Sequence, residues 1–486
     1  MNAIFTSLLL ATVQLASPFS DHMVLQRERQ VPVWGFGTPG EAVSVEFAGQ
    51  RLETTVGADG RWRVNLTPMA ASKEGRTLKA GGIEVRDVLV GEVWLCAGQS
   101  NMGVPLCGSG PRYRDRQGSL VAQMTHRPTI RYVETPSSKW DFCEHSATDA
   151  KLAWYAATPD NLMNRSFSAV ALYFALDVER EIDVPIGLVG VYRGSTCIDA
   201  WTPPEGLRTR PDLRDIAEWK YIPEEKWTDA DARGPINRPD LQPAAYWNTV
   251  VAPWTPFACR GMLWYQGEHD SAVGRYERYC SKLHALYDGW RTRFECPDMS
   301  FYYVQLCSWG KNIAPMQEVM AQFERECPKA AIAVINDIGN NDDIHPNEKA
   351  LVGHRLALHA LRRDYGFESI RDNSPSVESW CVASNTFEIV LKDCTSLYVY
   401  RKDGNFDLPF EIAGEDGVFR QAELLNLKVS TNGDKDGRLV GERLLVVGSK
   451  DVAEPKHLRY LHCAPWTGHL YNEVNLPLGA FHLDVP

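Results

Sequence analysis

Apolar and polar positions alternate through much of the first 88 residues, which is the pattern of half-buried β-strands. The pattern covers residues 43–47 and returns at residues 62–66, after the turn-forming pair Asp59-Gly60. An Asp-Gly pair between two alternating segments is typical of a tight β-hairpin. We therefore predict a small antiparallel β-sandwich over residues 1–88.

From residue 89 to residue 370 the pattern changes to short apolar runs separated by amphipathic segments. In the clearest amphipathic segment, residues 276–290, large side chains recur at steps of three and four residues, as on one face of a helix. This alternation predicts an α/β domain with a mostly parallel sheet, whose ligands bind beyond the carboxyl ends of the strands. The expected strands are Val93–Cys96, Leu188–Val191, Met262–Tyr265, Tyr302–Leu306 and Ala331–Ile335, and further helices are expected at Ala169–Val178 and Met316–Phe323.

Two other segments complete the expected organisation. Residues 205–245 are polar, with several prolines and charges, so we expect an excursion over the surface near the ligand-binding edge. Alternation returns at residues 387–391 and 397–399, which predicts a C-terminal β domain over residues 371–486.

The composition excludes some classes of partner. The net charge of -11 and the lack of a basic run argue against nucleic acid. The twelve cysteines are scattered without zinc-site spacing, which is more typical of small core residues than of a disulfide framework and favours a reducing compartment. Residues 4–16 could form the core of a signal peptide, but no Lys or Arg precedes them. A cytoplasmic location is therefore favoured over a periplasmic or secreted one, and no other stretch is long enough to span a membrane.

The stretch Gly98-Gln99-Ser100-Asn101-Met102 follows an expected strand and would put Ser100 at the start of a helix. A serine there can be a nucleophile if a base is near, and its own N–H can help to stabilise an oxyanion. The alternative is an ordinary helix N-cap, which is what most serines before helices are. The choice depends on whether other strand ends supply a base, an acid and further oxyanion donors.

Polar residues follow three more of the expected strands. Gly194 would let the backbone approach a substrate, and its N–H is a natural oxyanion donor, while the side-chain amide of Gln266 could donate to the same oxyanion. His345 is the best general-base candidate, because Pro346 is a favoured first residue of a helix and would hold His345 at its start. Each residue alone could be a solvated or capping residue. Together, four polar motifs at strand ends of one sheet indicate an active site.

Three carboxylates compete to be the acid that orients His345. Asp342 lies three residues earlier, a spacing that lets a carboxylate in a turn reach back to Nδ1–H. Asp343 is its direct competitor, and Glu268 is a third possibility from another loop. On this geometry we favour Asp342.

Taken together, these motifs resemble the sialate O-acetylesterase family of the SGNH (GDSL-like) hydrolase superfamily. The resemblance covers nearly the whole chain and also includes residues 19–27, 91–94, 459–460 and 470–472. Any one motif would be weak, but the combination is highly specific. The three strongest blocks are Gly98–Met102, Trp264-Tyr265-Gln266-Gly267-Glu268 and Asp343-Ile344-His345-Pro346.

The resemblance implies a three-layer α/β/α catalytic domain with β accessory domains. It also implies a serine esterase that removes acetyl groups from sugars, without a metal or other cofactor. Mapped by motif, Ser100 would be the nucleophile and His345 the base. The Ser100 N–H, Gly194 and Gln266 would form the oxyanion hole.

Two departures from the family pattern stand out. A block that is usually glycine-glycine-threonine-like reads Arg193-Gly194-Ser195-Thr196 here, which affects the surroundings of the acyl site. The usual glycine-leucine-proline near the end reads Asn475-Leu476-Pro477. The resemblance does not assign the triad acid to one residue, because the superfamily's D-x-x-H spacing selects Asp342 and the family's D-I-H-P string selects Asp343.

The expected partner is thus an O-acetylated sugar or glycan. One alternative is an esterase acting on plant polysaccharide such as acetylxylan or rhamnogalacturonan. The other is a carbohydrate-binding protein with a vestigial triad, for which two β regions and fifteen tryptophans would suit glycan stacking. The intact motif blocks favour an enzyme, and nothing in the sequence identifies the sugar or the oligomeric state.

Overall fold

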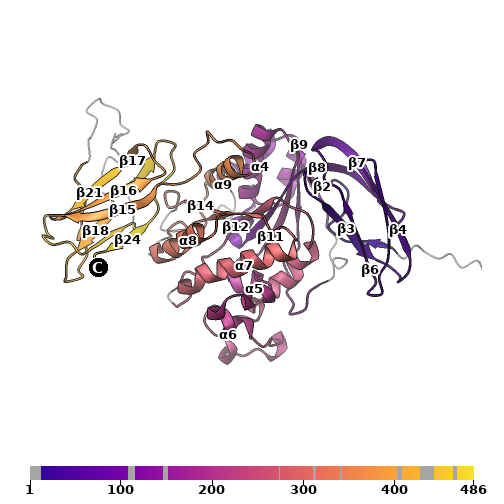
Figure 1. Cartoon of the computed structure of the whole chain (residues 1–486), viewed down its shortest axis with the longest axis horizontal. Helices are drawn as coiled ribbons and strands as arrows, with labels where there is room; N and C mark the ends of the chain where they lie inside the picture. Colours follow the sequence, from indigo (N-terminus) through magenta and orange to yellow (C-terminus); the bar gives the residue numbers. More distant parts are fainter. Residues whose placement is uncertain are drawn as a thin grey trace, which may run out of the picture.

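The computed structural model describes residues 13–107, 115–145, 152–272, 274–309, 313–339, 342–401, 408–426, 443–462 and 468–486, without the side chains of residues 400 and 401. The chain is an α/β protein with several sheets. A central α/β body lies between β-rich N-terminal and C-terminal regions at opposite ends of the molecule (Figure 1). Within the described ranges, no helix has both the length and the apolar character to cross a membrane.

The central sheet has the strand order β10-β9-β11-β8-β12-β13-β14. Neighbours from β9 to β14 along this order run parallel, and only the edge strand β10 is antiparallel to its neighbour. Five of these strands match the expected apolar runs to within a few residues at their carboxyl ends, whereas β9 and β10 were not anticipated. The bounds are β8 Ile83–Gly98, β9 Arg127–Glu134, β10 Tyr155–Ala157, β11 Ile186–Tyr192, β12 Gly261–Tyr265, β13 Ser300–Val304 and β14 Ala330–Ala333.

Helices cover both faces of the central sheet. On β13, the rings of Phe301 and Tyr303 lie 5.4 and 5.6 Å from Phe323 of α8, whereas Tyr302 between them lies 5.5 Å from His359 of α9. Because successive side chains of a strand point to opposite faces, α8 and α9 lie on opposite sides of the sheet. The α-helices are α1 Ser100–Gly103, α2 Gly118–Met124, α3 Pro159–Asn164, α4 Ala169–Ile182, α5 Pro204–Arg208, α6 Arg214–Ala217, α7 Tyr279–Arg293, α8 Ala314–Glu326 and α9 Lys349–Arg363.

The surface excursion expected at residues 205–245 consists of short helical turns rather than long elements. It passes below α7 in Figure 1, where α5 and α6 belong to it. A π-helical turn and a 3₁₀ turn then lead the chain back to β12. The short turns are η1 Ile198–Trp201, η2 Pro211–Leu213, η3 Glu224–Lys226, η4 Asp229–Asp231, η5 Pro239–Leu241, η6 Trp247–Val251, η7 Ala252–Trp254 and η8 Tyr276–Arg278.

The N-terminal strands form two β layers, but the turn at Asp59-Gly60 is not the hairpin that its sequence predicts. β5 pairs with β4 and β6 pairs with β3, so the segment between β5 and β6 crosses from one layer to the other. The tight hairpin lies instead at Ala48-Gly49, where φ is +50° and +81°. The bounds are β1 Gln14–Leu15, β2 Val24–Gln26, β3 Val31–Phe36, β4 Ala42–Phe47, β5 Gln50–Thr55, β6 Arg61–Leu66 and β7 Ser72–Ala80.

The division expected at residues 88 and 89 falls inside a continuous strand. The first half of β8 pairs with β7 and β2, and its second half pairs with β11 and β12 in the central sheet. One hydrophobic core runs through both regions, and for example Phe19 and Trp34 pack on Phe257. The two regions therefore share a core, because β8 carries the sheet from one to the other.

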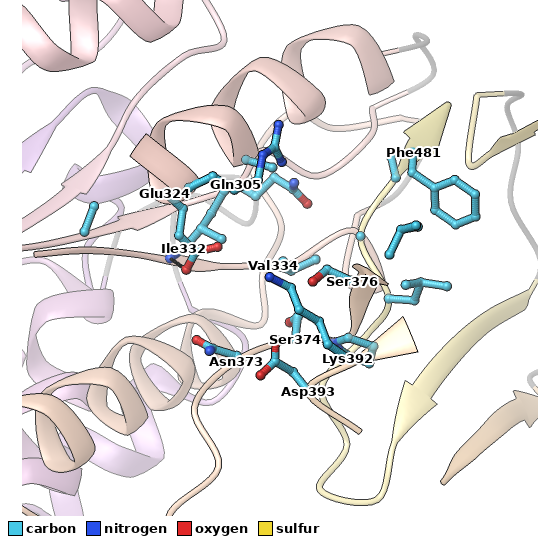
Figure 2. A pocket seen from close by; sticks show the side chains of 18 of the residues that line it. Gln305, Glu324, Ile332, Val334, Asn373, Ser374, Ser376, Lys392, Asp393 and Phe481 are labelled. Carbon is cyan, nitrogen blue, oxygen red and sulfur yellow. Dashed lines mark hydrogen bonds between the residues drawn. The ribbon is translucent and has the colours of Figure 1, made fainter. Parts of the chain in front are cut away.

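The C-terminal strands have a core of their own, which includes Phe387, Phe410 and Tyr460. A cavity of about 360 Å³ lies where this region meets α8 and β14, and Gln305, Glu324 and Lys392 are among its lining residues (Figure 2). The bounds are β15 Ser376–Ala383, β16 Thr386–Lys392, β17 Leu397–Arg401, β18 Phe410–Ala413, β19 Arg420–Gln421, β20 Glu423–Leu424, β21 Leu444–Gly448, β22 His457–Tyr460, β23 Gly468–Asn472 and β24 Phe481–Asp484.

Candidate active site

Ser100 lies directly beyond the carboxyl end of the central strand β8, as the first residue of the four-residue helix α1. The turn depends on Gly98, whose φ is +136° and where a Cβ would lie 2.1 Å from the carbonyl oxygen of Tyr265. Only glycine fits this conformation so close to the neighbouring strand. The Gln99 N–H donates to the same carbonyl at 3.0 Å, which fixes the start of α1. The expected strand, turn and helix start are thus confirmed.

His345 reaches Ser100 from the loop that precedes α9. Its Nε2 lies 2.9 Å from Ser100 Oγ, and its Nδ1 lies 3.2 Å from Oδ1 of Asp343. With the imidazole proton on Nδ1, that N–H donates to the carboxylate, and Nε2 accepts from the Ser100 hydroxyl. The side chains of His345 and Asp343 are only 11% and 23% exposed. The arrangement has the order of groups of a serine hydrolase triad.

The carboxylate that contacts His345 belongs to Asp343, so the geometric preference for Asp342 was wrong about the contact. The same oxygen of Asp343 accepts the backbone N–H of His345 at 2.9 Å and thereby holds the carboxylate beside the ring. Residues that are three positions apart face each other in a helical turn, but the segment that holds Asp342 and His345 is not helical. Pro346 also does not start the helix, because α9 begins at Lys349.

Gly194 approaches Ser100 as expected. In the parallel pair of β11 and β8, Tyr192 is level with Gly98, so the loop after β11 lies beside α1. A Cβ on Gly194 would lie 3.3 Å from Ser100 Cβ and 4.0 Å from Ser100 N. The backbones of Gly194 and Ser100 thus lie close to each other beyond the carboxyl ends of β11 and β8.

Gln266 does not direct its amide at Ser100, which corrects its expected role as an oxyanion donor. Its Nε2 donates to the carbonyl of Thr196 at 2.9 Å and to Asp270 Oδ2 at 2.7 Å. Its Oε1 accepts from the hydroxyl of Tyr279 at 2.7 Å. The side chain is fully buried and both amide hydrogens are used. Gln266 instead anchors the loop that carries Gly194.

Glu268 does not contact His345 in the structure, so it does not act as the third candidate acid there. Its Oε1 accepts from Nδ2 of Asn101, while its buried Oε2 has no hydrogen-bond partner in the described part of the chain. Burial raises the pKa of the Glu268 carboxyl above its ordinary value. The carboxyl is therefore a partner of the residue next to Ser100 rather than of the base.

Asn101, which stands in the Gly98–Met102 motif, and Lys349 are site residues to which the sequence assigned no role. Nδ2 of Asn101 also donates to the carbonyl of Ile344 at 3.0 Å, and Oδ1 accepts from Nζ of Lys349 at 2.6 Å. Lys349 is completely buried, which is rare for lysine and cannot be deduced from sequence pattern alone. Its only sequence signal is its place four residues after His345.

Burial and charge set the protonation of the base. Burial is the main cause that lowers the pKa of His345, the positive charge of Lys349 lowers it further, and Asp343 opposes both. Burial also lowers the pKa of Lys349 to about 8. The imidazole is therefore kept in its neutral, proton-accepting form to lower pH than in water.

Other polar features lie apart from this site. Among the described residues, two groups have suitable side chains and spacing to hold a metal, and neither contains Ser100, Asp343 or His345. They are Cys280, His284 and Glu326, and His457, His482 and Asp484. The cavity of Figure 2 also has none of the triad residues among its lining.

Comparisons with known proteins find sialate and carbohydrate acetylesterases. A family model described as "Carbohydrate esterase, sialic acid-specific acetylesterase" matches residues 242–362, which include His345 and Lys349 but not Ser100. The sialate O-acetylesterase of Rattus norvegicus is 27% identical over 452 residues, which is 82% of each chain. The human (Homo sapiens) sialate O-acetylesterase is 26% identical over 82% of this chain and 80% of its own.

A solved structure extends the similarity to nearly the whole chain. The crystal structure of a carbohydrate acetylesterase from Xanthomonas citri matches with a TM-score of 0.81 and 28% sequence identity. The match covers 98% of this chain and 100% of that one. The N-terminal and C-terminal β regions are therefore shared with a carbohydrate acetylesterase together with the central α/β body.

Proposed function

We propose that the chain, which is similar to sialate O-acetylesterases and to a carbohydrate acetylesterase, removes O-acetyl groups from sugars through an acetyl-serine intermediate. The observation that carries the proposal is the separation of 2.9 Å between Ser100 Oγ and His345 Nε2. A serine hydrogen-bonded to a histidine that is itself oriented by a third group, here Asp343, is the signature of an activated nucleophile. We also infer that residues 89–370 have the three-layer α/β/α arrangement of SGNH hydrolases, with β accessory regions at 1–88 and 371–486.

In the first step, Ser100 Oγ attacks the carbonyl carbon of the acetyl group while Nε2 of His345 takes the hydroxyl proton. Asp343 stabilises the imidazolium that forms, by accepting the Nδ1–H. The N–H groups of Ser100 and Gly194 stabilise the oxyanion, which is supported by the close approach of the two backbones. The bond to the sugar oxygen then breaks, and His345 gives its proton to that oxygen.

In the second step, water attacks the acetyl-serine while His345 takes one of its protons. The tetrahedral intermediate collapses, acetate leaves, and Ser100 regains its proton from His345. The lowered pKa of His345 suits this role, because the base must be neutral to start each step.

The experiment is to measure acetate release by the Ser100→Ala variant. We expect turnover to fall by at least about 10⁴-fold, as happens when a serine hydrolase loses its nucleophile. Ser271→Ala is the matched control, because Ser271 lies on the neighbouring loop and its hydroxyl donates only to the Glu268 carbonyl at 2.9 Å. Acid-quenched wild type should carry an acetyl group on the Ser100 peptide by mass spectrometry. Near-normal acetate release by Ser100→Ala would overturn the proposal.

The sugar is tested with a panel of substrates. Acetate release from O-acetylated sialic acid, acetylxylan and acetylated rhamnogalacturonan distinguishes a sialate O-acetylesterase from an esterase that acts on plant polysaccharide. A protein that binds these glycans without releasing acetate would instead be the carbohydrate-binding protein with a vestigial triad.

A further inference from the structure

Lys349 occupies a costly place beside the triad. It is fully buried and is the first residue of α9, where the positive end of the helix dipole disfavours a cation. Its Nζ lies 5.1 Å from the centroid of the Tyr265 ring and donates to Asn101 Oδ1 at 2.6 Å. Buried charges with a specific partner, held in a cleft beside reacting groups, are typical of functional sites.

Asn101 connects this cation to both catalytic segments. It follows Ser100 in the chain, and its Nδ2 donates to the carbonyl of Ile344, the residue before His345. A lysine ammonium can only donate, so Lys349 fixes which end of the Asn101 amide is the oxygen. With the oxygen facing Lys349, the amide NH₂ must face Ile344 and Glu268.

We propose that Lys349 is a positioning residue that acts through Asn101 to hold Ser100 and His345 together, and that its positive charge acts on His345 from the same place. The inference rests on the proposed function, in which His345 is the base. The orientation of Asn101 provides the positioning part. The electrostatic part rests on the same hydrogen bonds, because they leave only the Asn101 amide between the Lys349 ammonium and the carbonyl of Ile344, the neighbour of His345 in the chain. The two parts can be separated by mutation.

The charges around Lys349 come from several elements. It lies within the electrostatic reach of a thiol and three carboxylates, and one of these also accepts its backbone N–H at 3.2 Å. The groups are Cys307 after β13, Glu268 after β12, Asp115 before α2, and Asp343 in the histidine loop. Asp343 and Lys349 are charged groups that act on His345 in opposite directions.

The test compares two neutral replacements of Lys349. Lys349→Gln removes the charge and keeps a donor for Asn101, whereas Lys349→Met removes both. Lys73→Met is the control, because Lys73 is also a paired lysine but lies on the exposed surface of the N-terminal β region. The acidic limb of kcat/KM for p-nitrophenyl acetate should move to higher pH by roughly 0.5–1 unit in both Lys349 variants and not in Lys73→Met.

The positioning part predicts a further loss in one variant only. Lys349→Met should lower kcat at its own optimum pH several-fold more than Lys349→Gln, because only methionine removes the hydrogen-bond donor to Asn101 Oδ1. Adding Asn101→Ala should have less effect in Lys349→Met than in wild type, since the two residues act in series. Fully additive losses would refute the action through Asn101.

A measurement without turnover separates this inference from the proposed function. In the Ser100→Ala background, the pH dependence of His345 carbethoxylation by diethylpyrocarbonate, followed by peptide mass spectrometry, gives the pKa of His345. We expect a higher pKa when Lys349 is replaced by Gln or Met. An unchanged pKa in both folded variants would overturn the electrostatic part, even if Ser100→Ala confirms the esterase. The opposite combination is also informative. If the pKa of His345 rises in the Lys349 variants but Ser100→Ala still releases acetate, the electrostatic effect is upheld and the proposed function is rejected.

Discussion

Replacing Gln266 tests most directly whether this residue anchors the loop of Gly194 or donates to the oxyanion. Gln266→Met is the informative change, because methionine has a similar length and volume but forms no comparable hydrogen bonds. The structure predicts a loss of stability with a modest kinetic effect. An oxyanion donor would give the opposite result, a large loss of turnover at unchanged stability.

The size of the stability loss follows from the partners left behind. Asp270 Oδ2 retains the Ile198 N–H at 3.1 Å, and the Tyr279 hydroxyl retains the Gln266 carbonyl at 3.0 Å. The Thr196 carbonyl would lose the donor at 2.9 Å that the side chain provides. An orphaned buried carbonyl costs about 1–3 kcal/mol, and the two other lost hydrogen bonds contribute about 1 kcal/mol each or somewhat more. We therefore expect a loss of about 3–5 kcal/mol.

The assay combines thermal unfolding with kinetics on p-nitrophenyl acetate. A loss of this size should lower Tm by roughly 4–6 °C, since Tm shifts by about 1.3 °C per kcal/mol when roughly 360 residues unfold together. Well below Tm, kcat should fall less than about tenfold, because no donor to the acyl oxygen has been removed. Gln305→Met is the matched control, a buried glutamine just beyond β13 whose Nε2 makes one long hydrogen bond of 3.3 Å to the Gln317 carbonyl.

One result would refute this reasoning. If Gln266→Met lowered kcat by about 10²–10³-fold at an unchanged Tm, Gln266 would behave as a direct oxyanion donor. Its amide would then have to turn away from Thr196 and Asp270 when substrate binds.

Three further predictions follow from the geometry. Asp343→Asn should lower kcat by about 10³–10⁴-fold, because its amide would favour the wrong His345 tautomer, whereas Asp342→Asn should lower kcat less than about tenfold. Steady-state kinetics with the larger loss in Asp342→Asn would restore Asp342 as the acid. Activity should persist at a pH below the ordinary histidine pKa of about 6.5, because burial lowers the pKa of His345 and only its neutral form accepts a proton. An acidic midpoint of the pH profile of kcat/KM above about pH 6.5 would contradict this. Gly98→Ala should lower Tm far more than Gly40→Ala, because both glycines have positive φ but, of the two, only Gly98 has other atoms within 4 Å of where a Cβ would lie. Equal losses of Tm would show that backbone strain alone matters.

The fold was largely predictable because its strands are buried on both faces. Runs such as residues 93–96 and 262–265 are almost wholly apolar, which is how strands of a covered parallel sheet appear in sequence. β9 was missed because its first residues are polar and half of it is exposed or intermediate. The turn at Asp59-Gly60 was misread because a turn motif fixes local geometry and not which strands pair afterwards.

The sequence by itself determined which residues can do chemistry and roughly where the chain would bring them. Ser100, Gly194 and His345 each follow a recognisable strand or precede a helix, and parallel strands bring their carboxyl ends to one edge. The tertiary structure alone decided three things: that Asp343 contacts His345, that Gln266 points away from Ser100, and that Lys349 is buried beside them. These outcomes depend on side-chain direction and on burial by segments hundreds of residues apart, and neither quantity is encoded in local pattern or spacing.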